Sequence, residues 1–134
     1  MKNNFFKKVT TSILTLALCL SLVQPVLAGT STTDVGNYGT LTGTTSSRNR
    51  KVTGITRITK NPDRAYLTLK MEAMDINGEW VLDDYYNWSD RGATSLSDSS
   101  ATLPTDAYKV FATHGVQGGS TNPSYAVYTV TTLT

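Results

Sequence analysis

Short β-prone runs, each closed by turn residues, make up nearly all of the chain after residue 37. Threonine is abundant in these runs, and none of them carries the 3.6-residue apolar period of an amphipathic helix. The runs cover residues 38–45, 52–59, 65–74, 79–88, 93–99, 107–116 and 125–133. The sequence therefore predicts an all-β fold of about seven strands.

The run over residues 65–74 is the most regular of these. Apolar Leu67, Leu69, Met71 and Ala73 alternate with Tyr66, Thr68, Lys70 and Glu72. This alternation is typical of a strand with one face on a core. Asn77-Gly78 follows, and this pair favours a two-residue type I′ turn. We therefore expect residues 65–74 and 79–88 to form an antiparallel hairpin.

Turn signals recur about every dozen residues, as in a single antiparallel β-sandwich of the immunoglobulin-like type. We expect that architecture over residues 38–134, and a barrel is the alternative. Asp106-Ala107-Tyr108 resembles the tyrosine at the start of the sixth strand in immunoglobulin-like domains. The resemblance concerns topology and carries no function.

Residues 1–28 have the features of a cleaved secretory signal peptide. Lysines near the N-terminus precede an uncharged apolar run at residues 13–23, and Val26-Leu27-Ala28 ends in a small residue suited to cleavage. The apolar run is much shorter than the roughly 20 residues that span a bilayer. We therefore expect a secreted, extracellular bacterial product, either free or associated with the cell wall, that begins near Gly29 and has no membrane anchor.

Removal of this segment changes both charge and chemistry. Three of the 12 basic residues lie within residues 1–28 and all 10 acidic residues lie beyond, so the remainder has a net charge of −1. This balance argues against nucleic acid as a partner. The single cysteine, Cys19, also leaves, so the predicted product is free of disulfides and of thiol ligands. Residues 29–37 are rich in serine, threonine and glycine, and we expect a flexible leader there.

No catalytic residue is predicted. His114, the only histidine, alternates with apolar residues in the run 107–116, which favours a buried, hydrogen-bonded imidazole. Asp83 and Asp84 are adjacent on a strand and point to opposite faces, so they do not form a carboxylate pair without a bulge. Asp75-Ile76-Asn77-Gly78 is better explained as a turn than as a calcium loop, although bound calcium stays open. We expect no metal and no cofactor.

The aromatic residues of the run 79–88 supply the candidate binding site. Trp80, Tyr85, Tyr86 and Trp88 stand within nine residues. Period two would bury the carboxylate of Asp84, so we expect a bulge or strand end at Asp83-Asp84. That register predicts Trp80, Leu82 and Tyr85 in the core and Tyr86 and Trp88 outside. Tyr86, Trp88 and Asp90 are the predicted ligand-binding residues.

These patterns favour a secreted, non-enzymatic binding module over an enzyme. The expected ligand is an extracellular glycan, a cell-wall component or a protein, because aromatic faces on a rigid sheet suit all three. A small secreted effector, such as a bacteriocin-like antimicrobial or toxin, is the alternative. An enzyme would require a cleft that unites His114 with other groups or brings two carboxylates together.

Overall fold

The computed structural model describes residues 27–100 and 102–133, and the predicted signal peptide lies outside them except for its last two residues. The described residues form eight strands and a single turn of 3-10 helix. These are β1 (Leu27–Asp34), η1 (Gly36–Tyr38), β2 (Thr40–Arg48), β3 (Lys51–Ile58), β4 (Tyr66–Asp75), β5 (Trp80–Trp88), β6 (Ser95–Ser99), β7 (Ala107–Gln117) and β8 (Tyr125–Thr132). Among these residues, no helix is long and apolar enough to cross a membrane.

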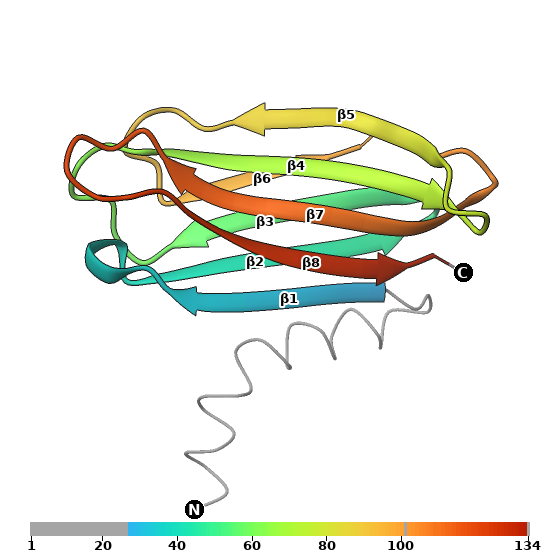
Figure 1. Ribbon diagram of the computed structural model, residues 1–134, viewed down its shortest axis with the longest axis horizontal. Coiled ribbons are helices and arrows are strands. Elements are labelled where there is room, and N and C mark those ends of the chain that lie inside the picture. Colours follow the sequence, from blue (N-terminus) through green and yellow to red (C-terminus); the bar gives the residue numbers. More distant parts are fainter. Residues whose placement is uncertain (1–26, 101, 134) are drawn as a thin grey trace, which may run out of the picture.

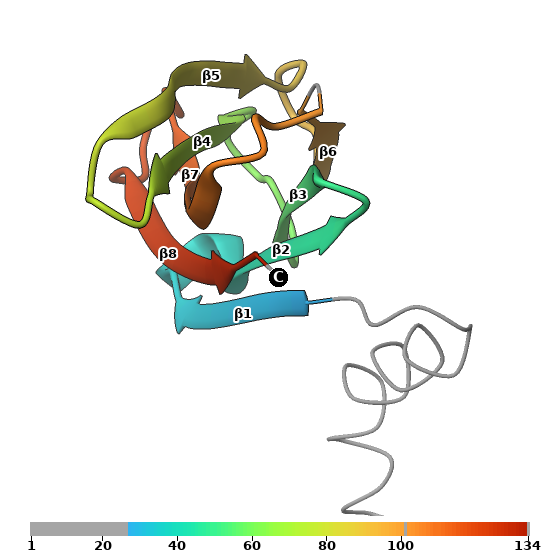
Figure 2. The ribbon, with the colours of Figure 1, turned by 90° about the vertical axis from the view of Figure 1, so that its right-hand side faces the viewer.

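The strands form two four-stranded sheets in which every neighbouring pair is antiparallel. One sheet has the order β1-β2-β3-β6 and the other β5-β4-β7-β8 (Figure 1). Seen along the strands, the two sheets enclose the core, and β8 lies beside β1 (Figure 2). The predicted all-β fold and its seven strands are confirmed, with β1 as an addition.

The added strand corrects the expectation of a flexible leader. Residues 29–34 belong to β1, which pairs with β2 along its whole length. This pairing uses backbone groups and needs no apolar pattern. Gly29 lies so close to β8 that a Cβ there would stand 2.7 Å from the Val130 carbonyl oxygen. Small residues in β1 therefore permit the approach of the two sheets at this edge.

The predicted alternation of β4 is confirmed. Leu67, Leu69, Met71 and Ala73 are fully buried between the sheets. The core is otherwise unusually polar, because Thr45, Thr56, Thr129 and Thr131 are buried with His114. Buried polar groups require hydrogen-bond partners, and these side chains largely supply them to one another.

The β4–β5 hairpin is confirmed, but its predicted type I′ turn is wrong. Of the loop residues, Gly78 has a positive φ of 85°, whereas Asn77 does not. Asp75 Oδ1 accepts hydrogen bonds from the backbone N–H groups of Asn77 and Glu79, at 2.8 and 2.9 Å. The backbone N–H of Asp75 also donates to the Glu79 carbonyl oxygen at 2.9 Å, so Asp75 and Glu79 close a three-residue loop over residues 76–78. Glycine takes the left-handed position that such loops require.

Replacing Gly78 by valine is expected to lower the free energy of unfolding by about 1–2 kcal/mol, because a β-branched residue must adopt the positive φ. The site is sterically open, since a Cβ added to Gly78 would have no neighbouring atom within 4 Å. Gly78→Asn is the matched control, because asparagine tolerates this conformation better. Urea denaturation measures both variants. An unchanged midpoint for Gly78→Val would contradict the assigned turn.

β5 and β6 are edge strands of the two sheets, and two polar contacts connect them across the side of the sandwich opposite β1 and β8. Asn87 Nδ2 donates a hydrogen bond to Asp98 Oδ2 at 2.5 Å, and the Tyr85 hydroxyl donates to the Ser99 carbonyl oxygen at 3.1 Å. Burial, together with the Asp98 carboxylate, raises the pKa of Tyr85 to about 12. The neighbouring Tyr85 hydroxyl, with hydrogen bonds from the Ser99 N–H and the Asn87 side chain, in turn lowers the pKa of Asp98 against the effect of burial. These inward residues hold β5 in place while its other side chains face solvent.

Asp63 joins the loops at the end of the molecule where β5 stops. Its Oδ2 accepts hydrogen bonds from the backbone N–H groups of Thr121 and Asn122 and from the Asn122 side chain. Burial raises the pKa of Asp63, but these hydrogen bonds and the nearby Tyr38 hydroxyl outweigh it and lower the pKa to about 2. The β3–β4 and β7–β8 loops are thereby tied together.

Candidate functional site

Two irregularities in the pairing of β5 with β4 decide which aromatic rings reach solvent. Trp88 pairs with Thr68 and Tyr86 with Lys70, and the register then shifts across Asp83-Asp84 so that Leu82 pairs with Ala73. This extra residue on β5 is the predicted bulge. Leu82 and Tyr85 accordingly pack against the core, while Tyr86 and Trp88 face outward, as expected.

A second shift overturns the prediction that Trp80 is a core residue. Leu82 pairs with Ala73 and Trp80 pairs with the next residue of β4, Met74, so Val81 is an extra residue on β5 without a partner in the pairing with β4. Because each extra residue exchanges the two faces of a strand, Trp80 returns to the outer face. Its side chain is 50% exposed, and its ring lies 5.9 Å from that of Phe111 on β7. All three outward rings of β5 therefore share one face of the sheet.

Three rings from β4 and β5 form a contiguous group, which we call the aromatic cluster: Tyr66, Tyr86 and Trp88. The Trp88 ring lies 5.6 Å from Tyr66 and 5.1 Å from Tyr86 between centroids, at interplanar angles of 90° and 74°. Edge-to-face contacts of this kind stabilise aromatic pairs beyond simple burial. Trp88 and Tyr86 nevertheless remain 47% and 44% exposed. The contacts between the rings therefore restrain the cluster, while part of the Trp88 and Tyr86 side chains remains accessible to solvent.

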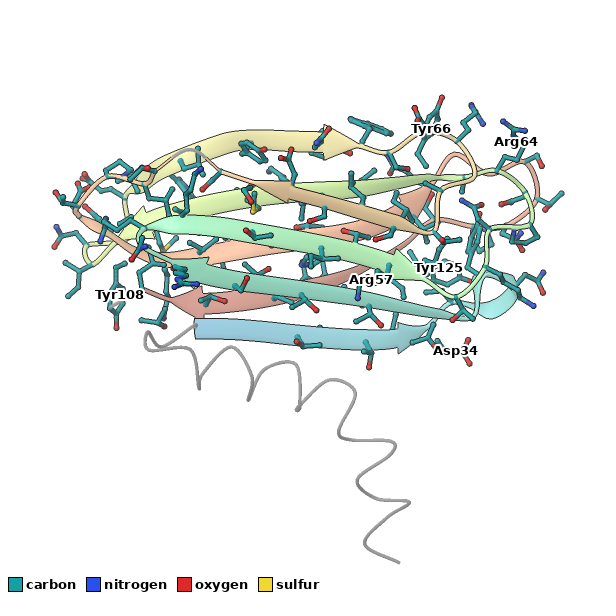
Figure 3. The ribbon with its side chains drawn as sticks, turned by 180° about the vertical axis from the view of Figure 1, so that it is seen from behind. Asp34, Arg57, Arg64, Tyr66, Tyr108 and Tyr125 are labelled. Carbon is teal, nitrogen blue, oxygen red and sulfur yellow. The ribbon has the colours of Figure 1, made fainter. Side chains whose placement is uncertain are left out.

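Arg91 fixes the end of the aromatic cluster. Its Nε donates a hydrogen bond to the Tyr66 hydroxyl at 2.9 Å, and its guanidinium carbon lies 4.4 Å from the centre of the same ring. Nη1 also donates to the carbonyl oxygens of Arg64 and Gly118, at 3.4 and 3.3 Å. Figure 3 shows Tyr66 beside Arg64 at this end of the sheet. A stacked, hydrogen-bonded guanidinium restrains the ring orientation.

The centre of the same outer face is charged. Lys70 forms an ion pair with Glu72 two residues along β4. Lys70 lies between Tyr86 of β5 and Thr113 of β7 in the pairing, and Glu72 lies beside Phe111. Tyr128 and Val130 of β8, which are 69% and 49% exposed, lie on the far side. The face therefore has apolar borders on its two outer strands and an ion pair between them.

Of the three predicted ligand-binding residues, the structure brings Tyr86 and Trp88 into contact. Asp90 lies in the turn after β5 with an exposed side chain. Its backbone carbonyl accepts hydrogen bonds from the Ser89 hydroxyl at 2.7 Å and from the Ala93 N–H at 3.4 Å. These contacts shape the turn that carries Arg91 toward Tyr66.

Tyr66 and Arg91 were missed by sequence reasoning. Tyr66 does stand on the outward-facing half of the alternation in residues 65–74, which was a usable signal. The antiparallel hairpin brings the start of β4 against the end of β5, so Tyr66 was a candidate neighbour of Trp88. Arg91 carried no comparable signal, because its position depends on the turn after β5.

His114 lies in the core and is not part of the outer face that carries the aromatic cluster. Its Nε2 hydrogen bonds with the hydroxyls of Thr129 and Thr45 at 3.0 and 3.3 Å, and its Nδ1 with that of Thr56 at 3.1 Å. Burial lowers the pKa of His114 to about 4, although a hydrogen bond to the Ile55 backbone acts in the opposite direction. Both ring nitrogens are engaged inside the fold, which confirms the predicted buried, hydrogen-bonded imidazole.

Comparison of the chain with protein-family models, with curated proteins and with solved structures gives no match.

Proposed function

We propose that this protein is a secreted, non-enzymatic module that binds an extracellular ligand through the aromatic cluster. The observation that carries the proposal is the exposure of Trp88 and Tyr86 on the regularly paired end of β5, beside a half-buried Tyr66. Exposed aromatic groups that are fixed by their neighbours are typical of binding surfaces, because little conformational entropy is lost when a ligand covers them.

Secretion is part of the proposal and is supported by the charge and apolar pattern of residues 1–28. The expected ligand classes are glycans, cell-wall components and proteins. A small secreted effector is the alternative function, and growth inhibition of neighbouring bacteria by the purified protein would favour it.

We also propose an immunoglobulin-like topology for β2 to β8. In immunoglobulin domains the first, second and fifth strands adjoin in one sheet, and the third, sixth and seventh adjoin in the other. The orders β2-β3-β6 and β4-β7-β8 correspond to these sets, with β5 paired to β4. Tyr108 stands near the start of β7, as the resemblance expects, with an exposed ring 5.8 Å from Lys109 Nζ.

A retention experiment tests the proposed function. Immobilised protein is exposed to cell-wall, glycan and protein fractions, in parallel with a Trp88→Ala variant. We expect at least one fraction to be retained by the native protein and released by the variant. Because Trp88 is 47% exposed, the substitution is expected to leave the fold intact, which circular dichroism verifies. Equal retention by both proteins, or none by either, would contradict the proposal.

A further inference from the structure

We propose that the ligand is a linear, uncharged polysaccharide that lies along β5 and contacts its outward rings in succession. This inference depends on the proposed binding function and specifies the chemistry of the ligand. Its basis is the distribution of rings and charges over the outer face of the β5-β4-β7-β8 sheet.

The rings of β5 follow a line along the strand. Each ring has its own partner on β4: Trp88 pairs with Thr68, Tyr86 with Lys70 and Trp80 with Met74. At about 3.4 Å per residue, the backbone positions of Trp88 and Tyr86 are about 7 Å apart along the strand, and their ring centroids are 5.1 Å apart. By the same rise, the β4 partners of Trp88 and Trp80 are separated by about 20 Å. β5 is also an edge strand, so no other strand of the described residues lies outside this line. A series of rings along an edge suits an extended polymer.

The position of the charges argues against a protein partner on this face. Protein interfaces have an apolar, charge-depleted centre and a polar rim. Here the order is reversed, because the ion pair of Lys70 and Glu72 is central and the exposed apolar groups lie on β5 and β8. A protein that spanned the face would bury this ion pair, at a substantial desolvation cost. A narrow polysaccharide bound along β5 would leave one side of the Lys70–Glu72 ion pair in water.

The chemistry of the outward rings on β5 and of their polar neighbours also matches a sugar polymer. The faces of aromatic rings are electron-rich, and they attract the weakly positive C–H faces of pyranose rings. Lys70, Glu72 and Arg91 flank the rings and supply donors and acceptors for sugar hydroxyls. The two charges on β4 are already paired with each other, so this pair adds no net charge that would favour an ionic polymer.

Binding to protein-free polysaccharides tests the inference. The purified protein is incubated with insoluble β-1,4-glucan, chitin, mannan and protease-treated peptidoglycan. Soluble hexasaccharides of the first three are titrated by intrinsic fluorescence, because both tryptophans of the chain lie on β5. We expect retention on at least one polysaccharide, with little change in 0.5 M NaCl, since ring stacking is not screened by salt. Trp88→Ala is expected to weaken binding at least tenfold.

Tyr128→Ala is the matched control, because this exposed tyrosine lies on the same face but on β8. It is expected to leave the affinity within about twofold, whereas Tyr86→Ala is expected to reduce it. Native affinity in Trp88→Ala, binding abolished by salt, or no retention on any of the four polysaccharides overturns the inference. If a protein is instead captured through Trp88, the inference fails and the proposed binding function stands. If no fraction of any kind depends on Trp88, both fail.

Discussion

Acidification from pH 7 to pH 4 is expected to remove about 3 kcal/mol of folding free energy, most of it through His114. Burial lowers the pKa of this imidazole from 6.5 to about 4 in the folded protein. Between these two values the unfolded chain binds a proton that the folded chain does not. Stability is therefore greatest above pH 6.5, falls as the pH decreases through this window, and stops changing through His114 only well below pH 4.

The other shifted acids act in a different range. The pKa values of Asp63 and Asp98 are lowered from 3.8, so their contribution to stability is present above that value and is lost as the pH falls below it. Urea denaturation at half-unit intervals from pH 4 to pH 7.5 thus isolates the histidine. His114→Gln is the control, and its stability is expected to be lower but nearly independent of pH in this window.

A direct titration is also possible, because the chain contains one histidine. The imidazole proton resonances are expected to shift with a midpoint near pH 4. A midpoint near 6.5, or a stability profile of the native protein that is flat between pH 4.5 and 7, would refute the buried neutral imidazole.

Gly43→Ala is expected to cost about 3 kcal/mol, at the upper end of the range for overpacked cores. A Cβ at this position of β2 would lie 2.3 Å from His114 Cδ2 and 2.4 Å from Cγ. The ring has little freedom to move, because the hydroxyls of Thr45, Thr56 and Thr129 hold both of its nitrogens. The missing side chain of Gly43 therefore provides the space that the imidazole occupies.

Two comparisons isolate this contact. Gly54→Ala on β3 would place its Cβ 2.6 Å from Leu69 Cδ1, the tip of a flexible side chain, so its cost is expected to be smaller. In a His114→Val background, the added methyl group at Gly43 is expected to cost at least about 1 kcal/mol less than in the native protein. Equal costs in the two backgrounds, measured by urea denaturation, would show that the clash with His114 is not the cause.

Local patterns in the sequence were sufficient for seven of the eight described strands and for parts of the site. Alternation in residues 65–74 identified the buried face of β4, because a strand directs successive side chains to opposite faces. The cost of burying the Asp84 carboxylate identified the bulge at Asp83-Asp84. The bulge in turn identified Tyr86 and Trp88 as outward residues. Each of these inferences needed only neighbouring residues and the period of a strand.

The tertiary structure decided what depends on distant partners. β1 has no apolar pattern of its own, and its place follows from backbone pairing with β2 and from close approach to β8. The second shift in β5, at Val81, left no sign in the composition of the strand, yet it placed Trp80 outside. The aromatic cluster likewise requires Tyr66 to meet Trp88 across the hairpin. The sequence determined which residues could alternate, whereas the faces of β5 followed from its register against β4, because one extra residue exchanges the two faces of a strand.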